Sequence, residues 1–208
     1  MNELTIPAQN TKGFSLRKQT VSWKKETKLL QEKLGEDYEI FLSLHKLAQK
    51  KPKKSLFDMK LFQRKYPDVP EVNNLLAYNY IARKRVEKAD ALTKENYLKN
   101  PKHLLSQINW AHISLRRKNL SIIDEIFDGK TDLRDICPGR KTFYIAEFEG
   151  FMTLMGYYHL ALGKRQEAEC YHYLAHKIAP KSFGTRILGR KLYHTPFYRK
   201  VLKLLRIK

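Results

Sequence analysis

Apolar residues along most of the chain recur three or four positions apart, the spacing that places them on one face of an α-helix. In the clearest example, from Gly156 to Ile178, two such stretches are separated by a short turn at Gly163. No segment alternates apolar and polar residues for long enough to indicate a β-strand. The pattern therefore predicts an all-α protein made of consecutive helices.

A regular repeat runs through this helical pattern. One period is the step from Pro67 to Pro101. When the chain is shifted by this step, residues of similar kind coincide: Leu42 with Leu76 and Trp110, Ser43 with Ala77 and Ala111, and Ser55 with Ala89. Pro180 follows after two more periods and a short insertion, for which the loop-like segment 128–140 has room. Small residues at matched places let paired helices approach closely, and each pair leaves an apolar face for the next to cover.

The period and its residue types resemble the tetratricopeptide-repeat (TPR) family, whose helix-turn-helix unit has the same length. The best-matching unit carries Gly156, Gly163, Ala168, Ala175 and Pro180, and the second-best carries Leu76, Ala77, Tyr80, Ala89 and Pro101. The resemblance covers residues 36–182 and implies a helix-turn-helix repeat solenoid. Its four units are expected at about 36–69, 70–103, 104–148 with the insertion, and 149–182.

Two basic segments flank the predicted array. Residues 1–35 contain one helical pattern, from Thr20 to Leu34, and residues 183–208 contain an amphipathic pattern that begins at Thr195. Both are expected to cap the array, whose ends would otherwise expose apolar surface. For the C-terminal helix the alternative is peripheral attachment to an anionic membrane surface. Within the array, Ser55 followed by Asp58 is the pattern of a capping box, which predicts that a helix begins there.

The composition adds a strong positive charge to this picture. There are 41 Lys and Arg against 21 Asp and Glu, and the segment 181–208 contains no acidic side chain. Such a chain attracts polyanions and acidic proteins. Cys137 and Cys170 form no paired motif, and the N-terminus lacks the apolar core of a signal peptide. We expect a soluble cytoplasmic protein.

The stretch from Gly156 to Pro180 also contains three histidines and a cysteine. His172 and His176 share one helix face, as zinc ligands often do, but the residues between them do not complete a zinc-protease motif. His159 and His172 fall where the repeat normally holds packing aromatics, so packing is the favoured interpretation. No phosphate-binding glycine loop or nucleophile elbow is present. The sequence therefore predicts no catalytic residue, no metal, no cofactor and no enzyme.

The first helices of such repeats line a concave groove in which a ligand can lie. The repeat alignment predicts which polar side chains face it. They are Asn74 and Tyr78 from the second unit, Asn109, His112 and Arg116 from the third, and Thr153 and Tyr157 from the fourth. The alternative is that these residues are merely exposed or lie between helices.

Basic residues recur at the turn between the two helices of each unit. They are Lys50 and Lys51, then Arg83, Lys84 and Arg85, then Arg116, Arg117 and Lys118, then Lys164 and Arg165. Stacked units would align these turns as a basic ridge, extended by Lys53 and Lys54. A ridge of this kind suits a phosphate backbone or an acidic protein strip. The alternative is surface charge that only keeps the protein soluble.

These patterns favour a non-enzymatic TPR-like scaffold or adaptor that holds a protein or peptide in its groove. The second hypothesis is a basic helical-repeat protein that binds RNA or DNA, or forms part of a ribonucleoprotein. Membrane contact through the C-terminal tail is the third.

Overall fold

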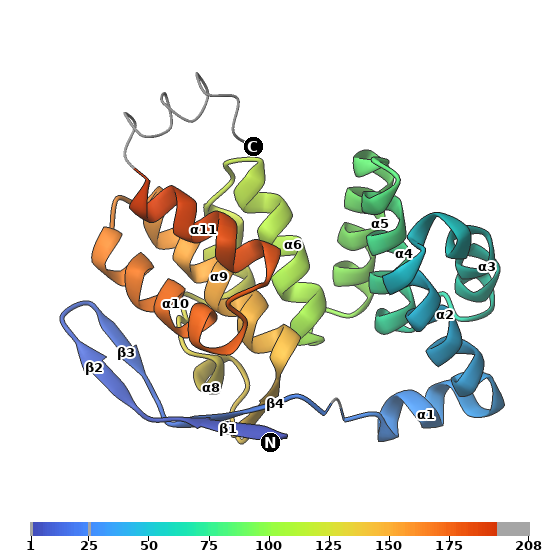
Figure 1. Ribbon diagram of the computed structural model, residues 1–208, viewed down its shortest axis with the longest axis horizontal. Coiled ribbons are helices and arrows are strands. Elements are labelled where there is room, and N and C mark those ends of the chain that lie inside the picture. The colour runs from blue at the N-terminus through green and yellow to red at the C-terminus, as the bar shows by residue number, and fades with distance from the viewer. Residues whose placement is uncertain (1, 25, 195–208) are drawn as a thin grey trace. The chain divides into compact units, whose positions relative to one another are not determined.

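The computed structural model describes residues 2–24 and 26–194, and it is mostly helical (Figure 1). The predominantly helical class is thus confirmed, although a few short strands are present that the sequence pattern did not predict. The chain forms two compact units. The central unit comprises Lys25–Arg117, and the terminal unit combines Met1–Lys24 with Lys118–Lys208.

The central unit consists of helices that each pack against the next along the chain. Their bounds are α1 Lys28–Leu34, a 3₁₀ turn Gly35–Asp37, α2 Tyr38–Lys50, α3 Pro52–Lys65, α4 Pro70–Ala82, α5 Val86–Lys99 and α6 Leu104–Arg116. The N-terminal helix predicted from Thr20 therefore starts only at Lys28, and residues 19–22 form a strand instead. Leu30 and Leu34 of α1 join the apolar core of α2, α3 and α4, so this helix covers one end of that core.

Proline residues mark where two of these helices begin. Pro52 and Pro70 occupy the first turns of α3 and α4, where a missing backbone N–H costs no hydrogen bond. The predicted capping box at Ser55 is wrong, because α3 already begins at Pro52. Ser55 is buried instead, and its hydroxyl donates to Asn79 Oδ1 on α4 at 2.7 Å. A small side chain is needed here because a neighbouring helix passes close by.

The terminal unit contains strands as well as helices. Strands β1 (Glu3–Ile6), β4 (Gln19–Ser22) and β5 (Thr142–Tyr144) form a sheet, in which β4 pairs antiparallel with β1 and parallel with β5. Strands β2 (Gln9–Thr11) and β3 (Phe14–Leu16) form a hairpin. The helices are α7 Ser121–Phe127, α8 Leu133–Ile136, α9 Ile145–Ala161, α10 Arg165–Ile178 and α11 Phe183–Tyr193.

The segment 128–140, predicted to be an insertion, contacts the N-terminal part of the chain. Its Asp132 is buried, caps α8 by accepting the Arg134 N–H at 2.8 Å, and accepts the Arg17 N–H at 2.6 Å. Strand β4 then pairs with β5, which is separated from it in the chain by the whole central unit. Such short strands carry little periodic signal, so only this long-range pairing reveals them.

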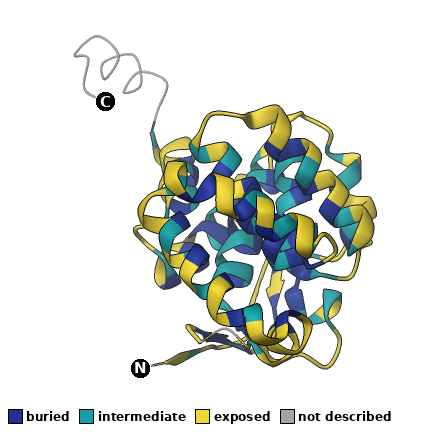
Figure 2. Ribbon diagram, turned by 90° about the vertical axis from the view of Figure 1, so that its right-hand side faces the viewer, coloured by how far each residue is buried: buried dark blue, intermediate teal, exposed yellow. Residues whose placement is uncertain are grey.

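Helix α11 covers α9 and α10 in the terminal unit. Its buried Leu188 packs so closely on Gly156 of α9 that a Cβ added there would overlap the Leu188 methyl group. The segment 183–208 was predicted to hold a capping helix beginning at Thr195, but that position lies outside the described residues. Figure 2 shows buried residues on helix faces that turn inward, while turns and outward faces are exposed.

One turn conformation occurs at three matched positions of the predicted repeat. Lys84, Lys118 and Gly163 follow α4, α6 and α9, with left-handed φ angles of 57°, 61° and 76°. After α4, Arg85 N–H donates to Tyr80 O and Lys84 N–H to Ile81 O, and after α9 the equivalent bonds join Lys164 to His159 and Gly163 to Leu160. This is the Schellman ending of a helix, in which glycine is the favoured left-handed residue.

Replacing Lys84 by glycine is expected to stabilise the central unit by about 0.5 to 1 kcal/mol, because a lysine in the left-handed region is strained. Lys50, one period earlier, ends α2 without that conformation and serves as the matched control. Lys50→Gly should instead be neutral or destabilising. Urea unfolding in a Trp23→Phe background, followed by Trp110 fluorescence, would measure both. A loss of stability in Lys84→Gly would show that this lysine makes contacts that outweigh its strain.

Candidate binding surfaces

The predicted groove residues Asn74 and Asn109 are linked across α4 and α6. The Asn109 amide donates to Asn74 Oδ1 at 3.1 Å, and the Asn96 amide on α5 reaches the same oxygen at 3.1 Å. Both groove asparagines are half-buried. They therefore serve the packing of three helices as well as facing outward.

Asn96 is the centre of a polar seam that we define as Asn73, Asn74, Asn96, Ser106 and Asn109. Its amide nitrogen lies 3.1 Å from three acceptors, which are the Pro70 carbonyl, Asn74 Oδ1 and Ser106 Oγ. Asn96 is buried, so water cannot replace these bonds. The seam fixes the start of α4 and the start of α6 against α5.

Tyr78 and Ile81 form the exposed part of the α4 face. Their exposed fractions are 45% and 56%, and they lie one helical turn apart just before the Arg83–Arg85 turn. Of the predicted groove residues on α6, His112 is half-buried and Arg116 is exposed. The repeat alignment predicts Tyr78 but not Ile81, although the helical spacing of Ile81 from Tyr78 places both on one face.

The groove residues predicted in the fourth unit do not face an open surface. Thr153 is buried, and its hydroxyl donates to the Glu149 carbonyl at 3.0 Å. Tyr157 is half-buried, its hydroxyl donates to the Gly184 carbonyl of α11 at 3.5 Å, and Lys191 Nζ lies 5.0 Å from its ring centre. Burial, and secondarily the charge of Glu149, raises the pKa of Tyr157 to about 12. Helix α11 covers this face. The residue pattern of the fourth unit, which ends before residue 183, gives no sign of this cover.

The basic ridge of the central unit is exposed and lies on neighbouring turns. Lys50, Lys51, Arg83, Lys84 and Arg85 are all exposed. The turns meet, because the Arg83 guanidinium donates to the Lys53 carbonyl of the preceding turn at 3.4 Å. Lys53 and Lys54 are exposed as well, so the edge between these turns is densely cationic.

Asp90 of α5 pairs with the two arginines at the end of α6. Its side chain is 8% exposed and forms ion pairs with Arg116 at 2.5 Å and Arg117 at 2.8 Å. The two arginine side chains are more than half exposed, at 52% and 56%. One buried carboxylate thus holds two guanidinium groups in place while leaving part of each open to solvent.

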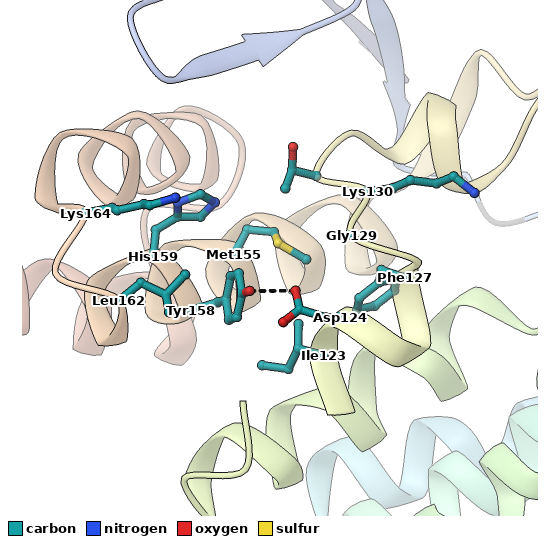
Figure 3. Close-up of a pocket in the computed structure, with 11 residues that line it drawn as sticks. Ile123, Asp124, Phe127, Gly129, Lys130, Met155, Tyr158, His159, Leu162 and Lys164 are labelled. Atoms are coloured by element: carbon teal, nitrogen blue, oxygen red, sulfur yellow. Dashed lines mark hydrogen bonds between the residues drawn. The ribbon is translucent and has the colours of Figure 1, made fainter. Parts of the chain in front are cut away.

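The remaining ridge residues, Lys118, Lys164 and Arg165, belong to the terminal unit. Arg165 pairs with Glu169 at 2.9 Å and also donates to the Leu192 carbonyl, so it holds the end of α11. Lys164 lines a small cavity beside His159 (Figure 3). Arg165 and Lys164 therefore have local surroundings within the terminal unit, whereas Lys118 is simply exposed.

His159 lies apart from the other two histidines of the stretch Gly156–Pro180, whereas the rings of His172 and His176 have centres 5.8 Å apart. His159 stacks on Tyr171 with ring centres 5.2 Å apart, and His172 lies near the Tyr193 hydroxyl of α11 at 3.4 Å. Burial lowers the pKa of both His159 and His172. Within residues 2–24 and 26–194, no three His, Cys, Asp or Glu side chains gather so that they could hold a metal ion.

Comparisons with family models, curated proteins and solved structures returned no match to this chain. In the part of the chain that the structure describes, every helix is too short or too polar to cross a lipid bilayer.

Proposed function

We propose that the protein is a non-enzymatic adaptor of TPR-like helix pairs that binds an acidic segment of a partner protein on its central unit. The observation that carries this proposal is the row of exposed cations on neighbouring turns, directly beside exposed Tyr78 and Ile81. The matching Schellman turns after α4 and α9, together with Lys118 after α6, support the repeat interpretation.

The chemistry of this surface suits carboxylates next to an apolar side chain. Arginine forms two-pronged hydrogen bonds with a carboxylate, and Arg116 and Arg117 are already positioned by Asp90. Lysines along the ridge add charge that accelerates the encounter with an acidic partner. Tyr78 and Ile81 add the apolar contact that charge alone does not supply.

The second candidate is an RNA- or DNA-binding protein. Residues 50–54 contain four exposed lysines and no carboxylate, and phosphate groups require charge but little side-chain geometry. In this case the apolar neighbours of the ridge would contribute little.

Reversing the charge of Lys51, Lys84 and Arg85 to glutamate is expected to weaken binding of an aromatic, Asp- and Glu-rich peptide by at least about tenfold, since three exposed pairs of roughly 0.5 kcal/mol are lost. Fluorescence anisotropy with the labelled peptide would measure the loss. The same reversal of Lys28, Lys33 and Lys46, which are all exposed in the central unit, is the control. Unchanged affinity in the ridge variant would leave the ridge with no role beyond solubility.

Ile81→Ser separates the two candidates, with exposed Leu98→Ser of α5 as its control. Loss of peptide affinity in the Ile81 variant alone supports the adaptor. Three results together would favour the nucleic-acid candidate over the adaptor. Single-stranded RNA would bind more tightly than the peptide, and Ile81→Ser would not change its affinity. A plot of log affinity against log salt concentration would fall with a slope of about 0.7 per phosphate contact.

A further inference from the structure

Helix α3 of the central unit has one buried face and one exposed face. Its inner face packs against α2 and α4, and Leu56, Met59 and Phe62 belong to the buried core there. On its outer face, Phe57 and Leu61 lie one helical turn apart, with exposed fractions of 70% and 48%. The core of the central unit therefore does not account for these two apolar side chains.

Exposed cations lie at both ends of this apolar pair. Lys53 and Lys54 come three to four residues before Phe57, and Arg64 comes three residues after Leu61, so all five share one helix face. In the part of the chain that the structure describes, none of these three cations forms an ion pair. Helix α3 contains five basic residues and one acidic residue, so its outer face is positively charged.

The matching face of α5 differs from that of α3. One predicted period after Phe57 and Leu61, the same positions hold Ala91 and Glu95, which are both exposed. Helix α5 contains three acidic and three basic residues, so its charges balance. A helix in this place therefore folds without an exposed apolar pair or a net positive charge. The outer face of α3 has properties beyond those that the predicted repeat requires.

An anionic lipid surface complements both properties. Lys53 and Arg64 are about 16 Å apart along the helix axis, and a membrane presents negative phosphates continuously over such a distance. Exposed aromatic and aliphatic side chains between cations can enter the boundary between headgroups and acyl chains. Fluid acyl chains can surround a side chain as exposed as Phe57, whereas a folded partner would need a pocket of matching shape.

We propose that the outer face of α3 docks the protein on an anionic membrane surface. Phe57 and Leu61 enter the acyl boundary, and Lys53, Lys54 and Arg64 contact lipid phosphates. This peripheral attachment goes beyond the proposed function, because the peptide surface contains neither Phe57 nor Leu61. The test is therefore built on these two residues.

Co-sedimentation of the full chain with vesicles would measure the attachment. Vesicles with equal amounts of phosphatidylcholine and phosphatidylserine should bind the protein, and pure phosphatidylcholine should bind it at least about tenfold more weakly. The double variant Phe57→Ser, Leu61→Ser should weaken binding to the mixed vesicles by about tenfold or more, since two apolar side chains no longer leave water. Leu98→Ser, at an exposed position of α5, is the control and should bind as the wild type does.

The contribution of charge has a matched pair of variants. Lys54→Gln should weaken binding to the mixed vesicles by about fivefold, because one cation near the lipid surface is lost. Lys88→Gln removes an exposed lysine one predicted period later, on α5, and should have a smaller effect. The basic segment 195–208, which lies outside the described residues, is present in every variant, so differences between variants report on α3.

Phe57→Trp gives a second measurement that does not depend on loss of binding. The added tryptophan should shift its emission to shorter wavelengths with the mixed vesicles, relative to the change in the wild type, and lipids with brominated acyl chains should quench it. Leu98→Trp is the control and should show neither effect. These signals require contact between residue 57 and the acyl chains.

The proposal is overturned if the wild type does not bind the mixed vesicles, or if the double serine variant binds them as tightly as the wild type. Tryptophan at position 57 that is neither shifted nor quenched would also overturn it. If the double variant instead loses affinity for the acidic peptide while its vesicle binding is unchanged, the outer face of α3 belongs to a protein-binding surface. Failure of the ridge variant to lose peptide affinity is a separate result, because the vesicle experiment contains no peptide.

Discussion

Replacing Asn96 by leucine is expected to destabilise the central unit by at least about 3 kcal/mol. Leucine has a similar size but no amide, so the two N–H donors that Asn96 shares among the Pro70 carbonyl, Asn74 Oδ1 and Ser106 Oγ would be lost in a buried setting, together with the Oδ1 that accepts from Asn100. Removing one partner of a buried hydrogen bond costs about 1 to 3 kcal/mol, even though Asn74 Oδ1 still accepts from Asn109. The polar seam therefore holds α4, α5 and α6 in register.

Tryptophan fluorescence can report this loss for the central unit alone. Trp110 lies in α6, and the chain's other tryptophan, Trp23, belongs to the terminal unit. Urea unfolding in a Trp23→Phe background would therefore follow Trp110. Leu98→Ala, at an exposed position of the same helix as Asn96, should change stability by less than about 0.5 kcal/mol. An equally small effect of Asn96→Leu would mean that the seam is dispensable.

Gly156→Leu is expected to cost the terminal unit about 3 kcal/mol or more, at the upper end of the usual cost of overpacking a core. Even a Cβ at this position would overlap the methyl group of Leu188, and it would lie 3.6 Å from the Ala168 carbonyl of α10. Leu188 is fully buried, so it cannot swing into solvent to make room. Unfolding in a Trp110→Phe background, followed by Trp23 fluorescence, would measure the loss.

A double-mutant cycle identifies the clash. Leu188→Ala alone should destabilise by creating a cavity, but in the Gly156→Leu background it should recover part of the lost stability. Ala161→Leu, at an exposed position of α9, is the control and should be tolerated. If the two changes are merely additive, the cost of Gly156→Leu arises from contacts other than α11.

Several predicted binding residues have packing roles that their sequence positions alone could not reveal. Asn74 and Asn109 were assigned to the groove, yet they bond to each other and to Asn96. Thr153 was assigned to the same groove, but α11 covers it. The repeat alignment identifies which helix face a residue occupies. It does not identify what lies against that face.

The sequence by itself determined the helices and the turns between them. The apolar spacing, the prolines at the starts of α3 and α4, and the small residues Ala77, Ala89 and Ala168, all buried, are local signals that each helix pair carries in its own residues. The left-handed residues Lys84 and Gly163 lie at matched positions of the predicted period, but Lys50, one period before Lys84, does not adopt this conformation.

Only the tertiary structure decided how distant segments meet. The pairing of β4 with β5, the docking of Arg17 on Asp132 and the cover of α11 over Gly156 each join residues far apart in the chain. The cavity at His159 arises in the same way, between α7, α9 and the loop after α7. Such contacts depend on complementary surfaces rather than on periodicity. A pattern read along the chain therefore predicts the elements but not the partners against which they pack.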